Sequence, residues 1–128
     1  VEGRLKKYDL PIYKDNRGRY VVHRIIDVTD EGYVICGDGL YDIEYDITDK
    51  NIIGIVTGFF RKEKYIDCSS KRYVKYVHFW VDNFYLRKPT IKLVRKLRRA
   101  KQILAEWAFK IKYGKKRFET EYKKETPP

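Results

Sequence analysis

Short runs of β-branched, aromatic and other apolar residues occupy most of the first eighty positions, and turn signals separate several of them. This pattern is typical of short β-strands joined by tight loops. Extended segments are predicted at residues 8–13, 20–28, 33–36, 51–60 and 71–81. The clearest turn signals are Asn16-Arg17-Gly18 and Thr29-Asp30-Glu31-Gly32, because Asn, Asp and Gly favour turn conformations. The sequence therefore predicts a mostly β body.

The pattern changes after Pro89-Thr90, a pair that suits the start of a helix. From there, apolar residues recur at helical spacing and basic residues take the opposite side. The apolar side of the helical wheel holds Leu93, Val94, Leu97, Ala100, Leu104, Trp107, Ala108 and Ile111. The basic side holds Lys92, Arg95, Arg98, Arg99, Lys110 and Lys112. We expect a β-rich body at 1–86, a basic amphipathic helix at 87–118 and a disordered tail at 119–128.

Charge follows the same division of the chain. The 128 residues carry a formal net charge of +11, yet residues 87–117 hold thirteen basic residues and a single acidic one. Three interpretations of the basic helix remain open. Its apolar side packs on the body, or it lies on an anionic membrane, or it binds nucleic acid. Contact with lipid or another polyanion would involve Lys92, Arg95, Arg98, Arg99 and Trp107.

Several classes of protein are excluded by the sequence. Two cysteines, Cys36 and Cys68, are too few for a disulfide framework, and no apolar run is long enough to span a bilayer. Residues 1–7 are polar and unlike a secretory signal. Zinc-ligand spacing, a P-loop and a dinucleotide fingerprint are all missing, so no cofactor and no metal site are expected. Because the chain begins with Val and contains no Met, we expect it to be a fragment, a processed product or a chain whose first residues are missing.

The hairpin predicted around residues 29–32 brings possible catalytic groups together. If those four residues form the loop, Val28 faces Tyr33, and the same register continued along the strands places His23 opposite Asp38. Opposed residues in a sheet have Cβ atoms about 4.5–5.5 Å apart. A carboxylate at that distance can orient an imidazole for proton transfer. An ordinary half-buried strand histidine is the competing interpretation.

Two motifs follow one another in the first half of the chain: Tyr20-Val21-Val22-His23-Arg24-Ile25-Ile26, then Tyr33-Val34-Ile35-Cys36-Gly37-Asp38. Their order resembles the signal peptidase I family, in particular its histidine-containing branch. Tyr8-Asp9-Leu10-Pro11-Ile12-Tyr13 is similar to the family's Gly-Asp-Ile-Val-Val-Tyr strand, and Ile52-Ile53-Gly54-Ile55-Val56 to a later one. The resemblance covers roughly residues 4–62. It implies a coiled, β-barrel-like domain of the type shared by signal peptidases and SOS repressors, here followed by the basic helix.

The resemblance also implies roles for individual residues. His23 would be the general base, with Arg24 and Gly37 as structural neighbours. Asp38 would be the carboxylate of the family's Gly-Asp motif. A second acid would be Glu44, with Asp42 as the alternative.

Three departures from the family pattern stand out. Gly39 replaces the usual Asn, and Tyr8 replaces the Gly that precedes the Asp of the first motif. The nucleophilic Ser precedes the His by some tens of residues in the family, whereas residues 1–22 contain no Ser. We therefore expect the nucleophile to lie upstream of Val1 or to have been lost.

The resemblance implies a serine endopeptidase that cleaves the signal peptides of preproteins. Such an enzyme is membrane-associated, with its active site on the extracytoplasmic side, and the basic helix would meet the anionic membrane surface. The alternative function is a small β-barrel module that binds nucleic acid through the basic helix. Interleaved aromatic and basic residues would then stack on bases, namely Tyr73, Lys75, Tyr76 and Phe79. SOS-type repressors use Lys as the base, so His23 speaks against that relative.

Overall fold

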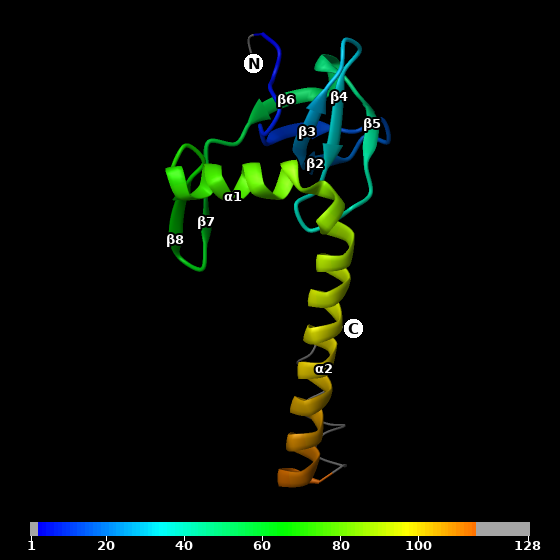
Figure 1. Cartoon of the computed structure of the whole chain (residues 1–128), viewed down its shortest axis with the longest axis vertical. Coiled ribbons are helices and arrows are strands. Elements are labelled where there is room, and N and C mark those ends of the chain that lie inside the picture. The colour runs from blue at the N-terminus through cyan, green and yellow to red at the C-terminus, as the bar shows by residue number, and fades with distance from the viewer. Residues whose placement is uncertain (1–2, 115–128) are drawn as a thin grey trace. The chain divides into compact units, whose positions relative to one another are not determined.

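The computed structural model describes residues 3–114 and divides the chain into two compact units (Figure 1). The first unit runs from Val1 to Lys88, and the second from Pro89 to Pro128. All of the strands belong to the first unit, whereas the described part of the second consists mainly of a single long helix.

The first unit contains eight short strands arranged in three small antiparallel sheets. The first sheet has the order β2-β1-β6 and consists of β1 (Pro11–Lys14), β2 (Tyr20–Val22) and β6 (Ile52–Ile55). The second has the order β3-β4-β5 and consists of β3 (Arg24–Val28), β4 (Tyr33–Cys36) and β5 (Glu44–Ile47). The third is the hairpin of β7 (Gly58–Arg61) and β8 (Lys64–Asp67). The predicted mostly β body is thus confirmed, and none of the sheets within residues 3–114 is closed into a barrel.

The hydrophobic core joins the two three-stranded sheets. Tyr13 from β1 and Ile25 from β3 are fully buried in it. Each points to the face of its strand that is turned towards the core, since successive side chains of a strand alternate between its two faces. The remaining members of the buried cluster are Leu5, Tyr33, Ile35 and Ile47. This core fixes β1, β3, β4 and β5 relative to one another, and the candidate site lies among the ends of these strands.

The single strand predicted over residues 20–28 is in fact two strands that belong to different sheets. Tyr20–Val22 pairs with β1, whereas Arg24–Val28 pairs with β4. His23 is the one residue between them. The backbone leaves one sheet and enters the other at this point, so His23 sits at the junction of the two sheets.

The loop of the second hairpin forms as predicted. Val28 faces Tyr33, and the backbone N–H of Thr29 donates to the carbonyl of Gly32 at 2.9 Å. Gly32 packs so closely on the backbone of Ile47 that a side chain at this position would collide with its carbonyl. The turn residues and the register next to the turn were therefore correctly inferred from the sequence.

The register further from the turn was wrong. A β-bulge at Ile26 shifts the pairing by one residue, so that Arg24 rather than Ile25 faces Cys36. His23 therefore does not face Asp38. The extra residue of a bulge changes which side chains are opposed, and strand propensity alone gives no signal for it.

The predicted strand over residues 71–81 was also wrong, because this segment is the helix α1 (Lys71–Asp82). Its aromatic and β-branched residues favour a strand by propensity. However, Val77 and Val81 are buried four residues apart, which is the spacing of one helical face. Packing of that face on the body outweighs the local preference.

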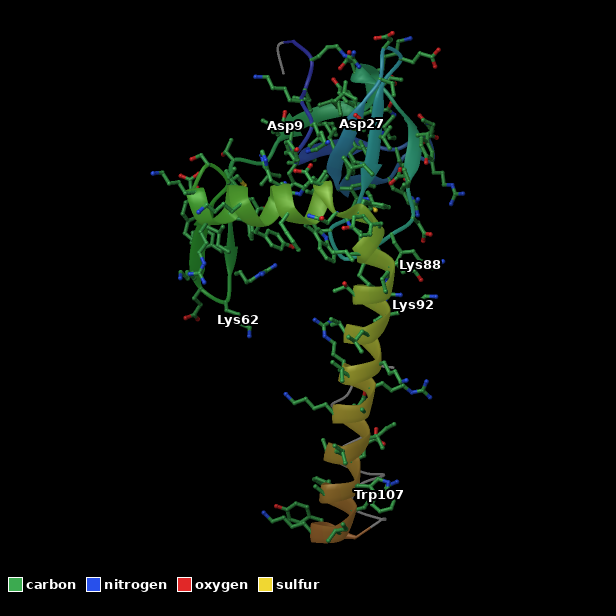
Figure 2. All side chains as sticks on the ribbon, viewed as in Figure 1. Asp9, Asp27, Lys62, Lys88, Lys92 and Trp107 are labelled. Carbon is green, nitrogen blue, oxygen red and sulfur yellow. The ribbon has the colours of Figure 1, made fainter. Side chains whose placement is uncertain are left out.

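The second helix, α2, spans Arg87–Tyr113 and is followed by Gly114 with φ of 85°. A glycine in the left-handed region is a common end of a helix, and its N–H donates to the carbonyl of Lys110 at 2.9 Å. Figure 2 shows Lys92 near the beginning of α2 and Trp107 towards its end. The last residues of the predicted helix, 115–118, and the predicted tail, 119–128, lie outside the described residues.

Candidate active site

His23 contacts two side chains from two other strands. Its Nδ1 lies 3.3 Å from Oε1 of Glu44 at the start of β5, and 3.3 Å from the hydroxyl of Tyr13 in β1. The Tyr13 hydroxyl also donates to Oε1 of Glu44 at 2.9 Å. The side chains of His23 and Glu44 are 27% and 34% exposed, so the pair lies at the edge of the core and is open to solvent.

Tyr13 is completely buried, and its burial raises the pKa of the phenol, to which the hydrogen bond with Glu44 adds. Tyr13 therefore stays protonated and acts as a donor to Glu44 throughout the neutral range. When Nδ1 of His23 carries the ring proton, this N–H donates to the Glu44 carboxylate that Tyr13 also holds. In that tautomer Nε2 carries the free lone pair, as a general base requires.

Gly37 forms the surface against which the His23 ring rests. A Cβ atom at position 37 would lie 2.9 Å from both Cδ2 and Nε2 of His23 and 3.0 Å from Cδ1 of Leu40. Real Cβ contacts are almost never so short, so only glycine leaves room for the imidazole. Two positions further on, a Cβ atom at Gly39 would have nothing within 4 Å. Of these two turn glycines, only Gly37 touches the His23 ring.

Asp38 binds Arg24 instead of His23. Its two carboxylate oxygens accept from Nε and Nη2 of Arg24, both at 2.9 Å, in the bidentate geometry that gives strong ion pairs. The Arg24 side chain is only 3% exposed. It also donates to the carbonyl of Tyr8 at 3.0 Å and to the hydroxyl of Tyr73.

Burial by itself would lower the pKa of the Arg24 guanidinium, but the hydrogen bonds and charge of Asp38, together with Tyr73, outweigh it and raise the pKa. Arg24 is therefore a permanent buried cation, and the charge of Asp38 balances it. The prediction that Asp38 supports the imidazole directly is corrected on this point. Asp38 acts on the neighbour of His23, and the carboxylate that contacts His23 is Glu44.

The structure also separates the two candidates for the second acid. Glu44 is half-buried and contacts His23, whereas Asp42 is exposed and has no hydrogen bond to His23 among the described residues. Glu44 starts β5, and the pairing of that strand with β4 holds its backbone in place. Glu44 is therefore the acid that the fold presents to the imidazole.

A cavity of about 300 Å³ lies beside this site. Its lining is mainly apolar and comes from several elements: Leu10, Val22, Asp38, Val56, Phe59 and Tyr73. Asp38 belongs both to this lining and to the candidate site, and Val22 directly precedes His23 in the sequence. Such a depression is suited to an apolar side chain of a bound molecule.

The serines of this sequence are not part of the site. Ser69 and Ser70 are its only two serines, and both hydroxyls donate to Asp67, at 2.7 and 2.8 Å. Within residues 3–114 neither hydroxyl is hydrogen-bonded to His23. A nucleophile for His23 is thus not provided by these two residues.

Sequence reasoning missed three residues that contribute to the site. Tyr13 appeared only as the end of an extended run, although it holds Glu44. Trp80 and Arg87 were assigned to the aromatic segment and to the basic helix, yet their side chains bind the backbone of Gly37 and Asp38. Spacing could not identify them, because they lie 42 and 50 residues from the atoms that they contact.

Among the described residues, no group of three or more His, Cys, Asp and Glu side chains is arranged to hold a metal ion. The described helices also include none that is both long enough and apolar enough to cross a membrane. Comparisons of the chain with protein-family models, with curated proteins and with solved structures give no match. The site is therefore interpreted from its own geometry and from the motifs in the sequence.

Proposed function

We propose that this chain provides the general base of a serine endopeptidase of the signal peptidase I type, on a coiled barrel-like β-domain. The observation that carries the proposal is the contact of His23 with Glu44, whose carboxylate is held in turn by the buried Tyr13. A histidine with one nitrogen held by a carboxylate and the other free is the arrangement that activates hydroxyl nucleophiles. The order of the motifs around His23 agrees with this chemistry.

In the proposed mechanism Glu44 accepts the Nδ1–H hydrogen bond and keeps Nε2 unprotonated. Nε2 takes the proton of a serine hydroxyl as its oxygen attacks a peptide carbonyl, and the imidazolium then gives this proton to the leaving amine. Water attacks the acyl-enzyme by the same route in reverse. The serine is supplied from outside the residues of this sequence, since Ser69 and Ser70 are bound to Asp67.

The substrate would be an extended peptide bound beside β2. In the first sheet β2 pairs with β1 on one side, and its other edge has no strand partner among the described residues. An extended peptide can add to such an edge through main-chain hydrogen bonds. A peptide bound there runs towards His23, which directly follows β2, and the apolar cavity beside Val22 would take one of its side chains.

The natural substrates would be preproteins cut after their signal peptides, on the extracytoplasmic side of a membrane. The basic side of α2 would hold this part of the chain against anionic lipid, because clusters of Lys and Arg bind such surfaces. The proposed lipid contacts are Lys92, Arg95, Arg98, Arg99 and Trp107. Trp107 is 64% exposed, as an aromatic residue at a headgroup layer would be.

The alternative, a nucleic-acid-binding module, has less support. It needs Tyr73, Tyr76 and Phe79 as a stacking surface, but Tyr73 is hydrogen-bonded to Arg24 and packs on Phe59 with ring centroids 5.6 Å apart. Tyr76 and Phe79 remain exposed on α1. The basic helix is consistent with both functions, so it does not favour the alternative.

The role of Glu44 is tested in the gene product that contains this chain, with peptides that span a signal-peptide cleavage site. Glu44→Gln keeps the shape but removes the charge that holds Nδ1–H, and we expect kcat to fall by roughly 100-fold or more. Asp42→Asn is the matched control and should retain activity close to the wild type. Equal effects of the two substitutions would contradict the assignment of Glu44.

A further inference from the structure

The turn at Gly37–Asp38 is bonded to side chains from far along the chain. Nε1 of Trp80, near the end of α1, donates to the carbonyl of Asp38 at 2.7 Å. Nη1 of Arg87, the first residue of α2, donates to the carbonyl of Gly37 at 3.2 Å. All four residues belong to the first compact unit, Val1–Lys88. Two consecutive carbonyls of the turn are thus held by side chains from the end of α1 and the start of α2.

Arg87 is an unusual residue to bury at this position. It is 0% exposed, and its guanidinium lies over the rings of Trp80 and Phe84, at 5.0 and 4.7 Å from their centroids. Its Nη2 donates to the carbonyl of Trp80 at 3.5 Å, and among the described residues its Nε has no hydrogen-bond partner. Within residues 3–114 the structure gives it no carboxylate partner.

A buried cation without a carboxylate and with an unpaired N–H destabilises a fold relative to an apolar residue of similar volume. The contacts of the guanidinium with the Trp80 and Phe84 rings offset part of this cost. Its hydrogen bond to Gly37 joins the start of α2 to the backbone of the candidate site.

The Gly37–Asp38 turn also contacts the side chains of His23 and Arg24. Gly37 packs against the Cδ2–Nε2 edge of His23, and the Asp38 carboxylate binds the Arg24 side chain. A displacement of the turn by a fraction of an ångström would change the contact of Gly37 with Nε2. The position of the imidazole thus depends on the position of these two carbonyls.

We propose that Trp80 and Arg87 are positioning residues that clamp the Gly37–Asp38 turn and thereby set the orientation of His23. The meaning of this clamp for catalysis rests on the proposed function, in which Nε2 of His23 is the base. The clamp itself is a property of the free chain and can be measured without a substrate.

The first measurement uses the wild-type chain and compares its two tryptophans by hydrogen exchange of the indole N–H. Trp107 is 64% exposed and serves as the internal reference. The hydrogen bond to Asp38 should slow exchange at Trp80 by at least tenfold relative to Trp107. Equal exchange rates would overturn the proposal without any need for a variant that folds.

The second measurement follows the His23 imidazole by ¹⁵N NMR, with its signals assigned by their loss in His23→Gln. Trp80→Phe keeps the aromatic ring but removes the donor, and Arg87→Lys keeps the charge but loses the fork of nitrogens. In the wild type we expect the ¹⁵N signals of an imidazole that is protonated at Nδ1. Both variants should instead give signals averaged over the two tautomers and over several ring positions. Arg72→Lys, at an exposed position of α1, and Tyr85→Phe, at an exposed aromatic residue, are the matched controls and should leave the wild-type signals unchanged.

A wild-type His23 spectrum in Trp80→Phe would overturn the proposal, even if Arg87→Lys failed to fold. In the active gene product, Trp80→Phe should lower kcat while KM changes less than twofold, because Trp80 does not line the cavity proposed to take a substrate side chain. If His23→Ala leaves cleavage intact but Trp80→Phe still alters the His23 spectrum, the clamp is correct and the proposed function is wrong. If cleavage needs His23 but not Trp80, the proposed function stands and the clamp has no catalytic role.

Discussion

At the scale of single residues, Gly37 shows how a turn residue can determine the geometry of a neighbouring side chain. We expect Gly37→Ala to displace the His23 ring, because the new methyl group would lie 2.9 Å from Nε2. Gly39→Ala is a control in the same turn, since its methyl group would meet no atom within 4 Å. Imidazole NMR signals should therefore shift in the first variant and not in the second. A shift of similar size in both would contradict the packing described for Gly37.

Tyr8 has a backbone conformation that is unusual for a residue other than glycine. It adopts φ of 81°, which lies in the left-handed region that glycine enters freely. Tyr8 is held there by a stacking contact with His78, at 3.8 Å between ring centroids, and by a 2.7 Å hydrogen bond to Asp82. Side-chain contacts with α1 thus hold this backbone conformation without a glycine. This conformation contributes to the site because the Tyr8 carbonyl accepts a hydrogen bond from Arg24.

Most of the candidate site residues could be found from the sequence, but their pairing could not. His23, Arg24, Asp38 and Glu44 were named from motifs, and the structure places them near one another. Which carboxylate contacts His23 depends on the bulge at Ile26, and a bulge leaves no mark in strand propensity. The contribution of Tyr13 depends on the pairing of strands that are distant in sequence, so no local pattern could reveal it.

At the scale of elements, the turn between β1 and β2 contains a carboxylate whose interactions are pH-dependent. Asp15 accepts backbone hydrogen bonds from Arg19 and Arg17, at 2.9 and 3.0 Å. The backbone bond from Arg19 is the main reason why the pKa of Asp15 lies below its usual range, and the Arg19 side chain adds to the effect. The carboxylate therefore stabilises the folded state only while it is ionised.

This effect predicts a pH dependence of stability. Since the pKa of Asp15 is lowered in the folded state, its contribution is present above the unfolded value of roughly pH 4 and is lost as the pH falls further. The free energy of unfolding, measured with urea, should fall between pH 6 and pH 3, and this fall should be smaller for Asp15→Asn than for the wild type. Equal falls for the two proteins would show that Asp15 is not the group responsible.

The strands next to tight turns were the elements best predicted from the sequence. The loop at residues 29–32 and the turn near Gly18 have strong Gly and Asx signals, and both formed as expected. The segment at residues 71–81 failed because its aromatic composition favours a strand, whereas burial of Val77 and Val81 favours a helix. Tertiary packing decides such a segment, and a single sequence does not contain that information directly.

At the scale of the whole molecule, the chain consists of a nearly neutral β-rich unit and a strongly basic helical unit. If α2 meets anionic lipid, each Lys or Arg at the surface contributes about 1 kcal/mol to binding. Replacement of Lys92, Arg98 and Arg99 by Gln should therefore weaken binding to vesicles that contain anionic lipid by roughly 100-fold.

The same loss of charge in the body provides the control. Replacement of Arg61, Lys62 and Lys64 by Gln removes three basic residues from the β7–β8 hairpin and should weaken vesicle binding much less. Vesicles of neutral lipid should bind none of the proteins appreciably. As a competitor, a short oligonucleotide is added at the same concentration of charge as the anionic lipid. If it abolishes vesicle binding, and if vesicle binding does not depend on the charge of the lipid, the nucleic-acid alternative is favoured.

The central claim is that His23 is the general base of a peptidase, and its most direct test compares the two histidines of the chain. In the gene product that contains this chain, His23→Ala should reduce cleavage of a signal-peptide substrate by at least 100-fold. His78→Ala should reduce cleavage far less, because His78 contacts the site only indirectly, through its stacking on Tyr8. A His23→Ala protein that cleaves the peptide at the wild-type rate would contradict the account.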